Sequence, residues 1–363
     1  MGLLVRELTL ENWRNFTHRN FIFSDGVTIL IGPNAVGKTN TIEALQMLTS
    51  GVSFRHSRPV QIIKEGSNTA HGQLKVIGDG RLIDISCDVS SNKRNYTFNG
   101  KSCRLQDLPH TLMSVLFTPD DLSLIKRSAT IRRDEIDSFG SQINNSYGKV
   151  LGAYLRSIEQ RNHLLKNPHV NEDLLDAWDI SVATGAAALL FARVKLFLRL
   201  REKVSSIYYE ISDGEKLDCS YSSTLGDVYQ MSKHEMETSL LNKLNESRTE
   251  DLRRQQTTIG PHHDDFSFLL NSHDARIYGS QGQQRTAVLA WKMAEVGVVE
   301  DILGIKPLLL LDDVMSELDQ RRRNAIVSFV KSNIQTIIST TNLDYFSKSL
   351  LIDSKVVHFD RNG

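Results

Sequence analysis

The stretch TILIGPNAVGKT, from Thr28 to Thr39, decides the fold class of this chain. A short apolar run leads into a glycine-rich turn, and the turn from Gly32 onward fits the pattern GxxxxGK[ST] without a mismatch. The residues that follow, from Lys38 to Ser50, have helical spacing, and Gly51 is a natural stop. A strand, a glycine loop and a helix in this order predict a phosphate-binding loop at a helix N-terminus.

Each part of this loop has a chemical role in the ATP site that we predict. The glycines let backbone N–H groups converge on the phosphates, and the helix directs its positive end toward them. Lys38 is expected to reach the β- and γ-phosphates and to act in catalysis, and Thr39 is expected to place its hydroxyl on Mg²⁺. The predicted cofactors are therefore ATP and Mg²⁺, and the predicted loop residues are Gly32, Pro33, Asn34, Ala35, Val36, Gly37, Lys38 and Thr39.

A second motif, LLLLDD, runs from Leu308 to Asp313. Four leucines predict a buried strand, and a buried strand that ends in two carboxylates needs a reason, because desolvated charge is costly. We expect Asp312 to hold Mg²⁺, directly or through water, and Asp313 to polarise the attacking water. Asp312 lies 273 residues after Thr39, and such a long insertion is typical of the ATP-binding-cassette class rather than of small kinases and GTPases.

A third motif, SQGQQR, opens a predicted helix at Ser280. Cassette ATPases carry a serine–glycine signature in this place, and its N–H groups contact the γ-phosphate of a nucleotide held by a second subunit. The chemistry needs a small hydroxyl, a glycine for close approach and a helix N-terminus, all of which occur here. We therefore predict that Ser280, Gln281 and Gly282 bind the cofactor and that ATP binding produces a homodimer.

The rest of the chain predicts an α/β protein interrupted by helices. Short alternating stretches between residues 71 and 101 predict an antiparallel meander, and residues 125–211 are mostly helical, with a break at Asn167-Pro168. The α/β pattern returns after Gly260, where Phe266–Leu270 and Ala275–Gly279 look like a hairpin. The predicted fold is an ABC-type P-loop ATPase head, with a mixed sheet, helices and the meander, over residues 1–122 and 255–363. A mainly helical lobe is expected at 123–254.

The bulk composition excludes several other classes of protein. The chain has 363 residues, zero formal net charge and three widely spaced cysteines, which suggests neither a disulfide framework nor a zinc site. No apolar run approaches the length of a membrane span, and the N-terminus lacks a signal-peptide pattern. We therefore expect a cytoplasmic protein with no membrane partner.

Taken together, GPNAVGKTN, SQGQQRT and LLLLDDVMSELD resemble the RecF family of recombination mediators, which are ABC/SMC-like ATPases of DNA repair. The N-terminal ENWRNF resembles the family's opening strand and loop, which implies that Arg14 and Asn15 lie beside the nucleotide. The resemblance runs from residue 3 to about residue 345. It implies an ATP-dependent DNA-binding protein of DNA repair, replication, recombination and the SOS response. Such a protein acts at single-stranded gaps and single–double-strand junctions, and helps load a recombinase with other mediator proteins.

Hydrolysis is predicted to be slow. Asp313 is one methylene shorter than the glutamate usual in fast cassette ATPases, so we expect a weak, DNA-stimulated ATPase that works mainly as a switch. One alternative is a cassette ATPase that does mechanical work, either of the SMC-like, chromosome-organising type or as a transporter subunit. The inserted helices are too short for the long coiled coils of the SMC-like type. A second alternative, a metabolic P-loop kinase, is disfavoured by the signature at Ser280.

Several basic clusters suggest contact with the DNA backbone. They are Lys126-Arg127, Arg132-Arg133, Arg193 to Lys203, Arg253-Arg254 and Arg321 to Arg323. No aromatic-interleaved code for base edges is visible, so sequence-independent, salt-dependent binding is expected. The run His262 to Asp265 has the composition of a metal site. However, neighbours on a strand point to opposite faces, so no metal site is expected there.

Overall fold

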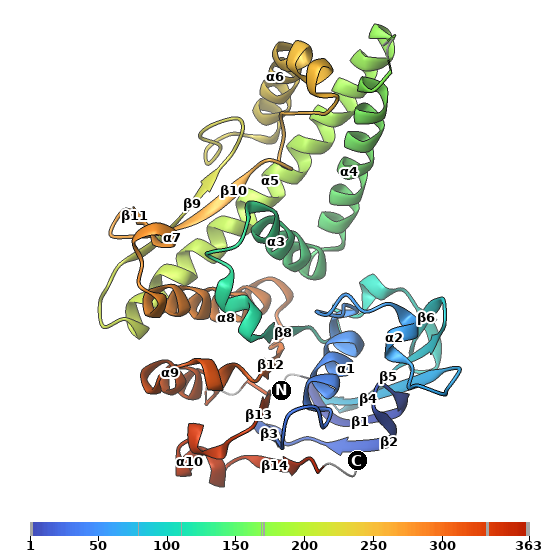
Figure 1. Ribbon diagram of the computed structural model, residues 1–363, viewed down its shortest axis with the longest axis vertical. Helices are drawn as coiled ribbons and strands as arrows, with labels where there is room; N and C mark the ends of the chain where they lie inside the picture. The colour runs from blue at the N-terminus through green and yellow to red at the C-terminus, as the bar shows by residue number, and fades with distance from the viewer. Residues whose placement is uncertain are drawn as a thin grey trace. The chain divides into compact units, whose positions relative to one another are not determined.

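The computed structural model describes residues 3–360 except Asp79, His110, Pro168, Val170, Ser332 and Asn333. Half of the predicted break at Asn167-Pro168 thus lies outside the described residues. The chain packs as two compact units, residues 1–122 with 292–363, and residues 123–291 (Figure 1). Among the described residues the first unit contains two sheets and the second contains one.

A parallel sheet forms the centre of the first unit. Its strand order is β14 (Lys355–His358), β3 (Val27–Ile31), β13 (Thr336–Thr340), β12 (Leu308–Asp312) and β8 (Ser114–Phe117). Every neighbouring pair in this sheet is parallel. Strands β12 and β13 are buried at every position, as is usual in a parallel sheet, and β12 accordingly carries a run of four leucines. The carboxyl ends of β3, β12 and β13 therefore meet at one edge of the sheet.

The meander forms a second, antiparallel sheet in the same unit. Its order is β2 (Phe16–Ile22), β1 (Leu4–Trp13), β4 (Ala70–Gly78), β5 (Arg81–Ser90), β6 (Lys93–Phe98) and β7 (Lys101–Cys103). The predicted α/β class with parallel and antiparallel strands is confirmed, but the two kinds of strand occupy separate sheets rather than one mixed sheet. Helix α1 (Lys38–Ser50) packs against strands of both sheets, so it is buried on nearly every side.

The first unit also contains three shorter α-helices among the described residues. They are α2 (Pro59–Ile62), α9 (Gln320–Val330) and α10 (Lys348–Ile352). Helix α9 begins where Asp319 accepts a hydrogen bond from the backbone N–H of Arg322, and α10 begins in the same way at Ser347.

The second unit is built on long helices. They are α3 (Ala129–Ile143), α4 (Asn145–Leu165), α5 (Glu172–Ile211) and α6 (Lys233–Arg254). By length and composition α5 is apolar enough to cross a membrane, but it packs against α3, α4 and α6, and it carries the buried Arg193. This composition suits a helix inside a protein core. The guanidinium of Arg161 on α4 joins the helices, since it contacts Asp179 on α5 at 2.6 Å and Asp251 on α6 at 2.7 Å.

The second unit also contains a three-stranded sheet, with the order β11 (His273–Asp274), β10 (Asp265–Leu270) and β9 (Leu217–Ser222). Because β10 pairs with β9, residues 255–291 pack with the helices. The structure therefore divides the chain at 122/123 and 291/292, whereas the second boundary was predicted at 254/255. Helix α8 (Gln281–Leu303) starts in this unit and crosses the 291/292 boundary into the first unit.

The expected strand at Ala275–Gly279 is wrong. Residues Ala275–Tyr278 form the one-turn helix α7, because Asp274 accepts a hydrogen bond from the N–H of Arg276 and starts a helical turn. The hairpin is completed instead by the two residues of β11, which pair with Leu269 and Leu270.

Candidate nucleotide-binding site

The glycine loop connects the end of β3 to the start of α1, as the sequence predicts. Gly37 has φ 111°, and a Cβ placed on it would lie 2.5 Å from the ring of Phe16. A Cβ on Gly32 would lie 2.5 Å from the carbonyl oxygen of Phe359. Neither position accepts a side chain, so the loop backbone is held close to the elements around it.

Lys38 is buried at the base of this loop, with 6% of its surface exposed. Its Nζ donates hydrogen bonds of 2.7 Å to the carbonyl oxygens of Gly32 and Pro33. Burial lowers the pKa of Lys38, while the charges of Asp313 and Asp312 act against that shift. The ammonium group therefore lies within reach of both the loop backbone and the acidic pair.

Asp312 ends β12 beside the loop, where two hydroxyl groups contact it. Thr39 Oγ1 donates to its Oδ1 at 3.1 Å, and Ser339 Oγ donates to the same atom at 2.6 Å. Burial raises the pKa of Asp312, and these hydrogen bonds lower it in part. A threonine hydroxyl and a carboxylate are hard oxygen ligands of the kind Mg²⁺ prefers, so this pair fits the predicted metal.

Ser339 was missed by the sequence reasoning. It lies directly opposite Asp312 in the register of β12 and β13, and its hydroxyl is within hydrogen-bonding distance of both acidic residues. The available signal was its place at the end of the short apolar stretch Gln335 to Ser339, where a polar side chain follows two isoleucines.

Asp313 adopts a left-handed backbone conformation with φ 53°, which turns the chain out of the sheet. Its N–H donates to the carbonyl oxygen of Ser339 at 3.2 Å and to the hydroxyl at 3.0 Å. Its Oδ1 is buried and has no hydrogen-bond partner among the described residues. Burial raises the pKa of Asp313; the charge of Lys38 lowers it, and those of Asp312 and Glu317 raise it. A carboxylate oxygen that is buried, has a raised pKa and has no hydrogen-bond donor among the described residues is suited to accept a proton from water.

Of the two N-terminal residues, Asn15 lies against the phosphate loop and Arg14 does not reach toward it. Asn15 Nδ2 donates to the carbonyl oxygen of Val36 at 3.1 Å, and Asn40 Nδ2 donates to Asn15 Oδ1 at 2.7 Å. Arg14 Nη2 instead contacts both carboxylate oxygens of Glu43 at 2.8 Å. The charge of Arg14 is therefore paired within the unit.

Glu43 is a second residue that the sequence reasoning missed. It is fully buried in α1, five residues after Lys38, where an ordinary helix would place an apolar side chain. Burial would raise the pKa of Glu43, but hydrogen bonds from Arg14, Ser53 and Ser57 lower it below its usual value. The arrangement fixes the turn that carries Asn15.

The signature residues Ser280 to Gly282 lie in the second unit, whereas the phosphate loop lies in the first. Ser280 Oγ accepts a hydrogen bond of 3.2 Å from the N–H of Gln283, and Gln283 Oε1 accepts one of 2.8 Å from the N–H of Ser280. This reciprocal capping box starts α8. Ser280 and Gln281 are exposed, and Gly282 is half-buried.

The run His262 to Asp265 is occupied by internal contacts. His262 contacts Tyr154 at 2.5 Å, Asp264 accepts a hydrogen bond from Tyr221 at 2.9 Å, and Asp265 pairs with Arg132 at 2.7 Å. Burial lowers the pKa of His262 to about 4. No group of three or more metal-ligating side chains occurs among the residues that the structure describes.

Several arginines of the basic clusters are held by acids of the same unit. The pairs are Arg132–Asp265, Arg193–Asp137, Arg201–Asp218, Arg253–Glu250, Arg254–Glu250 and Arg322–Asp319. Arg132 and Arg193 are also buried. Lys126, Lys195 and Arg199 are exposed. The predicted phosphate-contacting surface is thus smaller than the sequence suggested.

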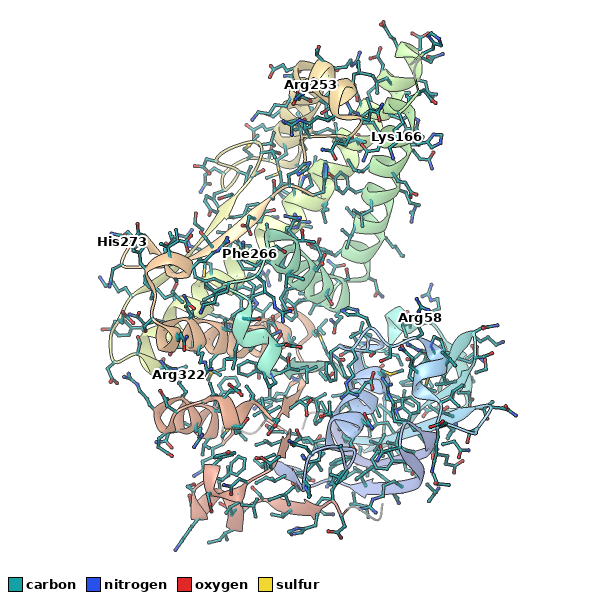
Figure 2. All side chains as sticks on the ribbon, viewed as in Figure 1. Arg58, Lys166, Arg253, Phe266, His273 and Arg322 are labelled. Atoms are coloured by element: carbon teal, nitrogen blue, oxygen red, sulfur yellow. The ribbon has the colours of Figure 1, made fainter. Side chains whose placement is uncertain are left out.

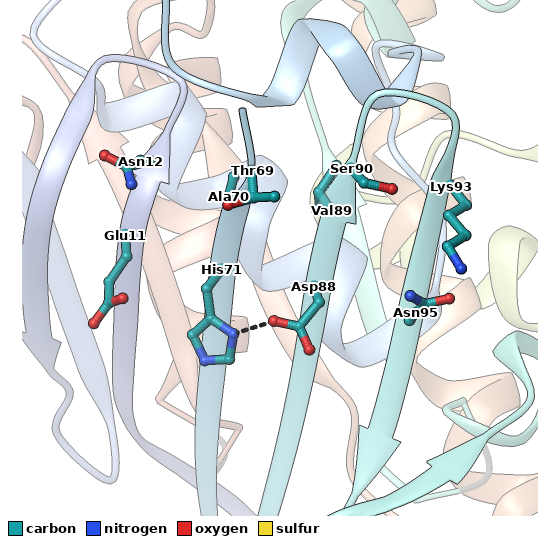
Figure 3. A pocket seen from close by; sticks show the side chains of 10 residues that line it. All are labelled: Glu11, Asn12, Thr69, Ala70, His71, Asp88, Val89, Ser90, Lys93 and Asn95. Atoms are coloured by element: carbon teal, nitrogen blue, oxygen red, sulfur yellow. Dashed lines mark hydrogen bonds and ion pairs between the residues drawn. The ribbon is translucent and has the colours of Figure 1, made fainter. Parts of the chain in front are cut away.

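A separate pocket of about 390 Å³ lies on the antiparallel sheet (Figure 3). Glu11, His71, Asp88 and Asn95 form a row across four neighbouring strands, and His71 contacts Asp88 at 2.7 Å. No residue of the glycine loop lines this pocket. The pocket is therefore separate from the predicted phosphate-binding loop.

Residues 4–360 match the model of the family described as the RecF/RecN/SMC N terminal domain. The chain is 36% identical over 358 residues to a protein named DNA replication and repair protein RecF from Clostridium perfringens, covering 98% of this chain and 97% of that protein. A protein of the same name from Symbiobacterium thermophilum is 38% identical over 348 residues, covering 94% and 92%.

The solved structure of the recombination mediator protein RecF with ATP superposes with a TM-score of 0.87 at 32% identity, covering 95% of this chain and 94% of that chain. An Smc head domain from Pyrococcus furiosus superposes with a TM-score of 0.54 at 15% identity, covering 98% and 93%, which is a likeness of fold alone. The predicted ABC-type ATPase head and the predicted family resemblance are both confirmed.

Proposed function

This chain belongs to the RecF/RecN/SMC N-terminal domain family, and we propose that it is an ATP-binding protein of DNA replication, repair and recombination that ATP joins into a dimer. The observation that carries this proposal is the meeting of Lys38, Asp312 and Asp313 at one glycine loop. Two relatives of known structure are named with ATP or its analogue, which supports the same ligand here.

In this proposal the loop backbone from Gly32 to Gly37 holds the phosphates. Lys38 exchanges its contacts with the Gly32 and Pro33 carbonyls for contacts with phosphate oxygens. Thr39 and Asp312 hold Mg²⁺, which when bound neutralises charge that develops on the phosphates. Asp313 accepts the proton of the attacking water at its unpartnered Oδ1.

The second half of the site comes from another copy. The exposed Ser280 and the half-buried Gly282 lie at a helix N-terminus, a feature that binds anions. We propose that these residues contact the γ-phosphate held by the glycine loop of a second copy. ATP binding then favours the dimer, and slow hydrolysis at Asp313 releases it, with DNA stimulating turnover.

We propose that the dimer binds DNA through its backbone, at single-stranded gaps and single–double-strand junctions. The proposal includes loading of a recombinase with other mediator proteins, a part in the SOS response and a cytoplasmic location. Two solved relatives are named as recombination mediators of the RecFOR pathway, which supports a role in recombination. The exposed cations Lys126, Lys195 and Arg199 are among the candidate phosphate contacts in the inserted lobe.

Sedimentation velocity with and without ATP tests the dimer. Wild type is expected to dimerise with ATP, whereas Lys38→Met and Ser280→Arg each remain monomeric. An equimolar mixture of the two variants is expected to dimerise more than either alone, because one complete site forms between the intact loop and the intact signature. Wild type that stays monomeric with both ATP and DNA would contradict the proposal.

Binding to DNA is tested by a salt series on two unrelated duplexes of equal length. The affinity is expected to fall steeply with salt and to be the same on both duplexes, since counterion release dominates backbone binding. A flat salt response, or a strong preference for one sequence, would contradict backbone binding.

A further inference from the structure

Two large apolar side chains project from α7, directly before the signature. Ile277 is 69% exposed and Tyr278 is 70% exposed. Both lie within three residues of Ser280 in the sequence. Figure 2 labels His273 at the start of this segment, and the ring of His273 meets the edge of the Tyr278 ring at 5.6 Å between centroids.

Exposure here does not reflect a loose segment, because α7 is fixed at both ends. Asp274 caps its first turn through a 2.8 Å hydrogen bond from the N–H of Arg276. At the other end the buried side chain of Gln284 donates to the carbonyl oxygens of Ala275 at 2.8 Å and Gly279 at 3.1 Å. A Cβ on Gly279 would lie 2.6 Å from the Ala275 carbonyl, so the turn admits only glycine.

Gln284 belongs to α8, the helix that Ser280 starts. The same helix therefore holds both the signature and α7, and the two form one rigid surface. Two residues of chain span at most about 7 Å, so the Tyr278 backbone lies within that distance of Ser280. A molecule that receives a hydrogen bond from Ser280 therefore lies close to the α7 backbone that carries the exposed Ile277 and Tyr278.

We propose that Ile277 and Tyr278 anchor a second copy of this chain, against the surface that surrounds its bound nucleotide. This inference rests on the proposed ATP-dependent dimer and adds to it the residues that supply apolar contact. Aromatic and aliphatic side chains that enter a partner's surface carry most of the energy of small interfaces. Because α7 is already ordered, little conformational entropy is lost when it binds. The hydrogen bonds of Ser280 and Gly282 then set the register, while α7 supplies affinity.

The test is a matched set of four variants in the full chain. Ile277→Lys and Tyr278→Ala change the anchor. Ile180→Lys and Tyr209→Ala make the same changes on α5, at side chains that are 57% and 53% exposed. The dimer constant is measured by sedimentation velocity at saturating ATP. Binding of a fluorescent ATP analogue by monomers at low protein concentration reports the glycine loop separately, and a thermal melt reports folding.

Each anchor variant is expected to weaken the ATP-dependent dimer about tenfold or more, with unchanged melting temperature and monomer nucleotide affinity. The α5 variants are expected to dimerise like wild type. Anchor variants that dimerise as tightly as wild type would overturn this inference and leave the proposed dimer standing. An equal loss from Ile180→Lys would also overturn it, as a general effect of added charge. Wild type that remains monomeric with ATP would instead overturn the proposed function, and the anchor with it.

Discussion

The glycine loop and the signature are both short turns that lead into a helix, but they differ in the contacts that surround them within their own unit. In the loop, Lys38 is buried and its ammonium contacts two backbone carbonyls, with the acidic pair close by. In the signature, Ser280 is exposed and its hydroxyl accepts a hydrogen bond from the N–H of Gln283, at the start of its own helix. The proposed catalytic residues thus lie beside the loop in its own unit, whereas the hydrogen bonds of Ser280 among the described residues run to its own helix.

This difference teaches which half of the site needs a partner. Asp313 Oδ1 is a buried carboxylate oxygen with no hydrogen-bond donor among the described residues, which costs stability and is consistent with the catalytic role proposed for it. An exposed helix N-terminus beside two exposed apolar side chains costs little and is suited to association. Variants that change either the loop half or the signature half of the proposed site separate the two, and the largest expected effect comes first.

The chemistry belongs to the loop half, and Asp313→Asn is expected to remove it without removing either binding half. An amide cannot accept the proton of the attacking water, so DNA-stimulated ATP turnover is expected to fall by about 10²–10⁴-fold. The ATP-held dimer is expected to persist for longer. Phosphate release and sedimentation velocity measure the two effects. Asp313→Glu is expected to raise turnover, and unchanged turnover for Asp313→Glu with DNA present would count against the assigned role.

Lys38→Met is expected to break the loop half itself. Hydrogen bonds to charged groups contribute about 1.5–3 kcal/mol each, so loss of the ammonium is expected to weaken ATP binding about 100-fold. Titration with a fluorescent ATP analogue measures this affinity. Lys348→Met, the same change at an exposed lysine of the first unit, is the control and is expected to bind like wild type. Equal affinities for the two variants would exclude Lys38 from the phosphate site.

Ser280→Ala is expected to affect the signature half and spare the loop half. Loss of one hydrogen bond to the γ-phosphate is expected to weaken the ATP-dependent dimer about tenfold, with ATP binding by the monomer unchanged. Ser232→Ala is a matched control, because Ser232 caps α6 with the same 3.2 Å hydrogen bond and the same capping box. Both variants lose a helix cap, so an equal effect on dimerisation would show that only the cap matters.

The smallest effect expected is on the stability of the nucleotide-free protein. Because burial raises the pKa of Asp313, the folded state binds this proton more tightly than the unfolded state does. The stabilisation is present below the ordinary value of 3.8 and is lost as pH rises through the raised pKa. At pH 8 Asp313→Asn is therefore expected to melt about 1–3 °C higher than wild type, with a gap that narrows as pH falls. Differential scanning calorimetry measures this difference in melting temperature. A difference that widens toward low pH would mean that the pKa of Asp313 is lowered rather than raised.

The parts of the site that depend on a short continuous stretch of sequence could be predicted. The strand before Gly32, the helix after it and the buried strand before Asp312 are local patterns of apolar spacing, and the structure places them as expected. The strand at Ala275 was wrong because a single cap at Asp274 and a buried amide at Gln284 outweigh a weak alternating pattern. The boundary near residue 254 differed because strand pairing, rather than composition, joins residues 255–291 to the helices.

The sequence by itself determined the glycine loop, the acidic strand end, the signature and the family, because each is a short run whose chemistry depends on neighbours in the chain. Only the tertiary structure decided the partners of charged groups, because a partner is chosen by distance in space. Glu43 is the partner of Arg14, and Ser339 lies beside Asp312. Acidic residues of the protein also pair with several arginines, such as Arg193, that the sequence analysis had predicted to contact DNA. The exposure of Ile277 and Tyr278 was decided in the same way, since burial is a property of packing and no local pattern encodes it.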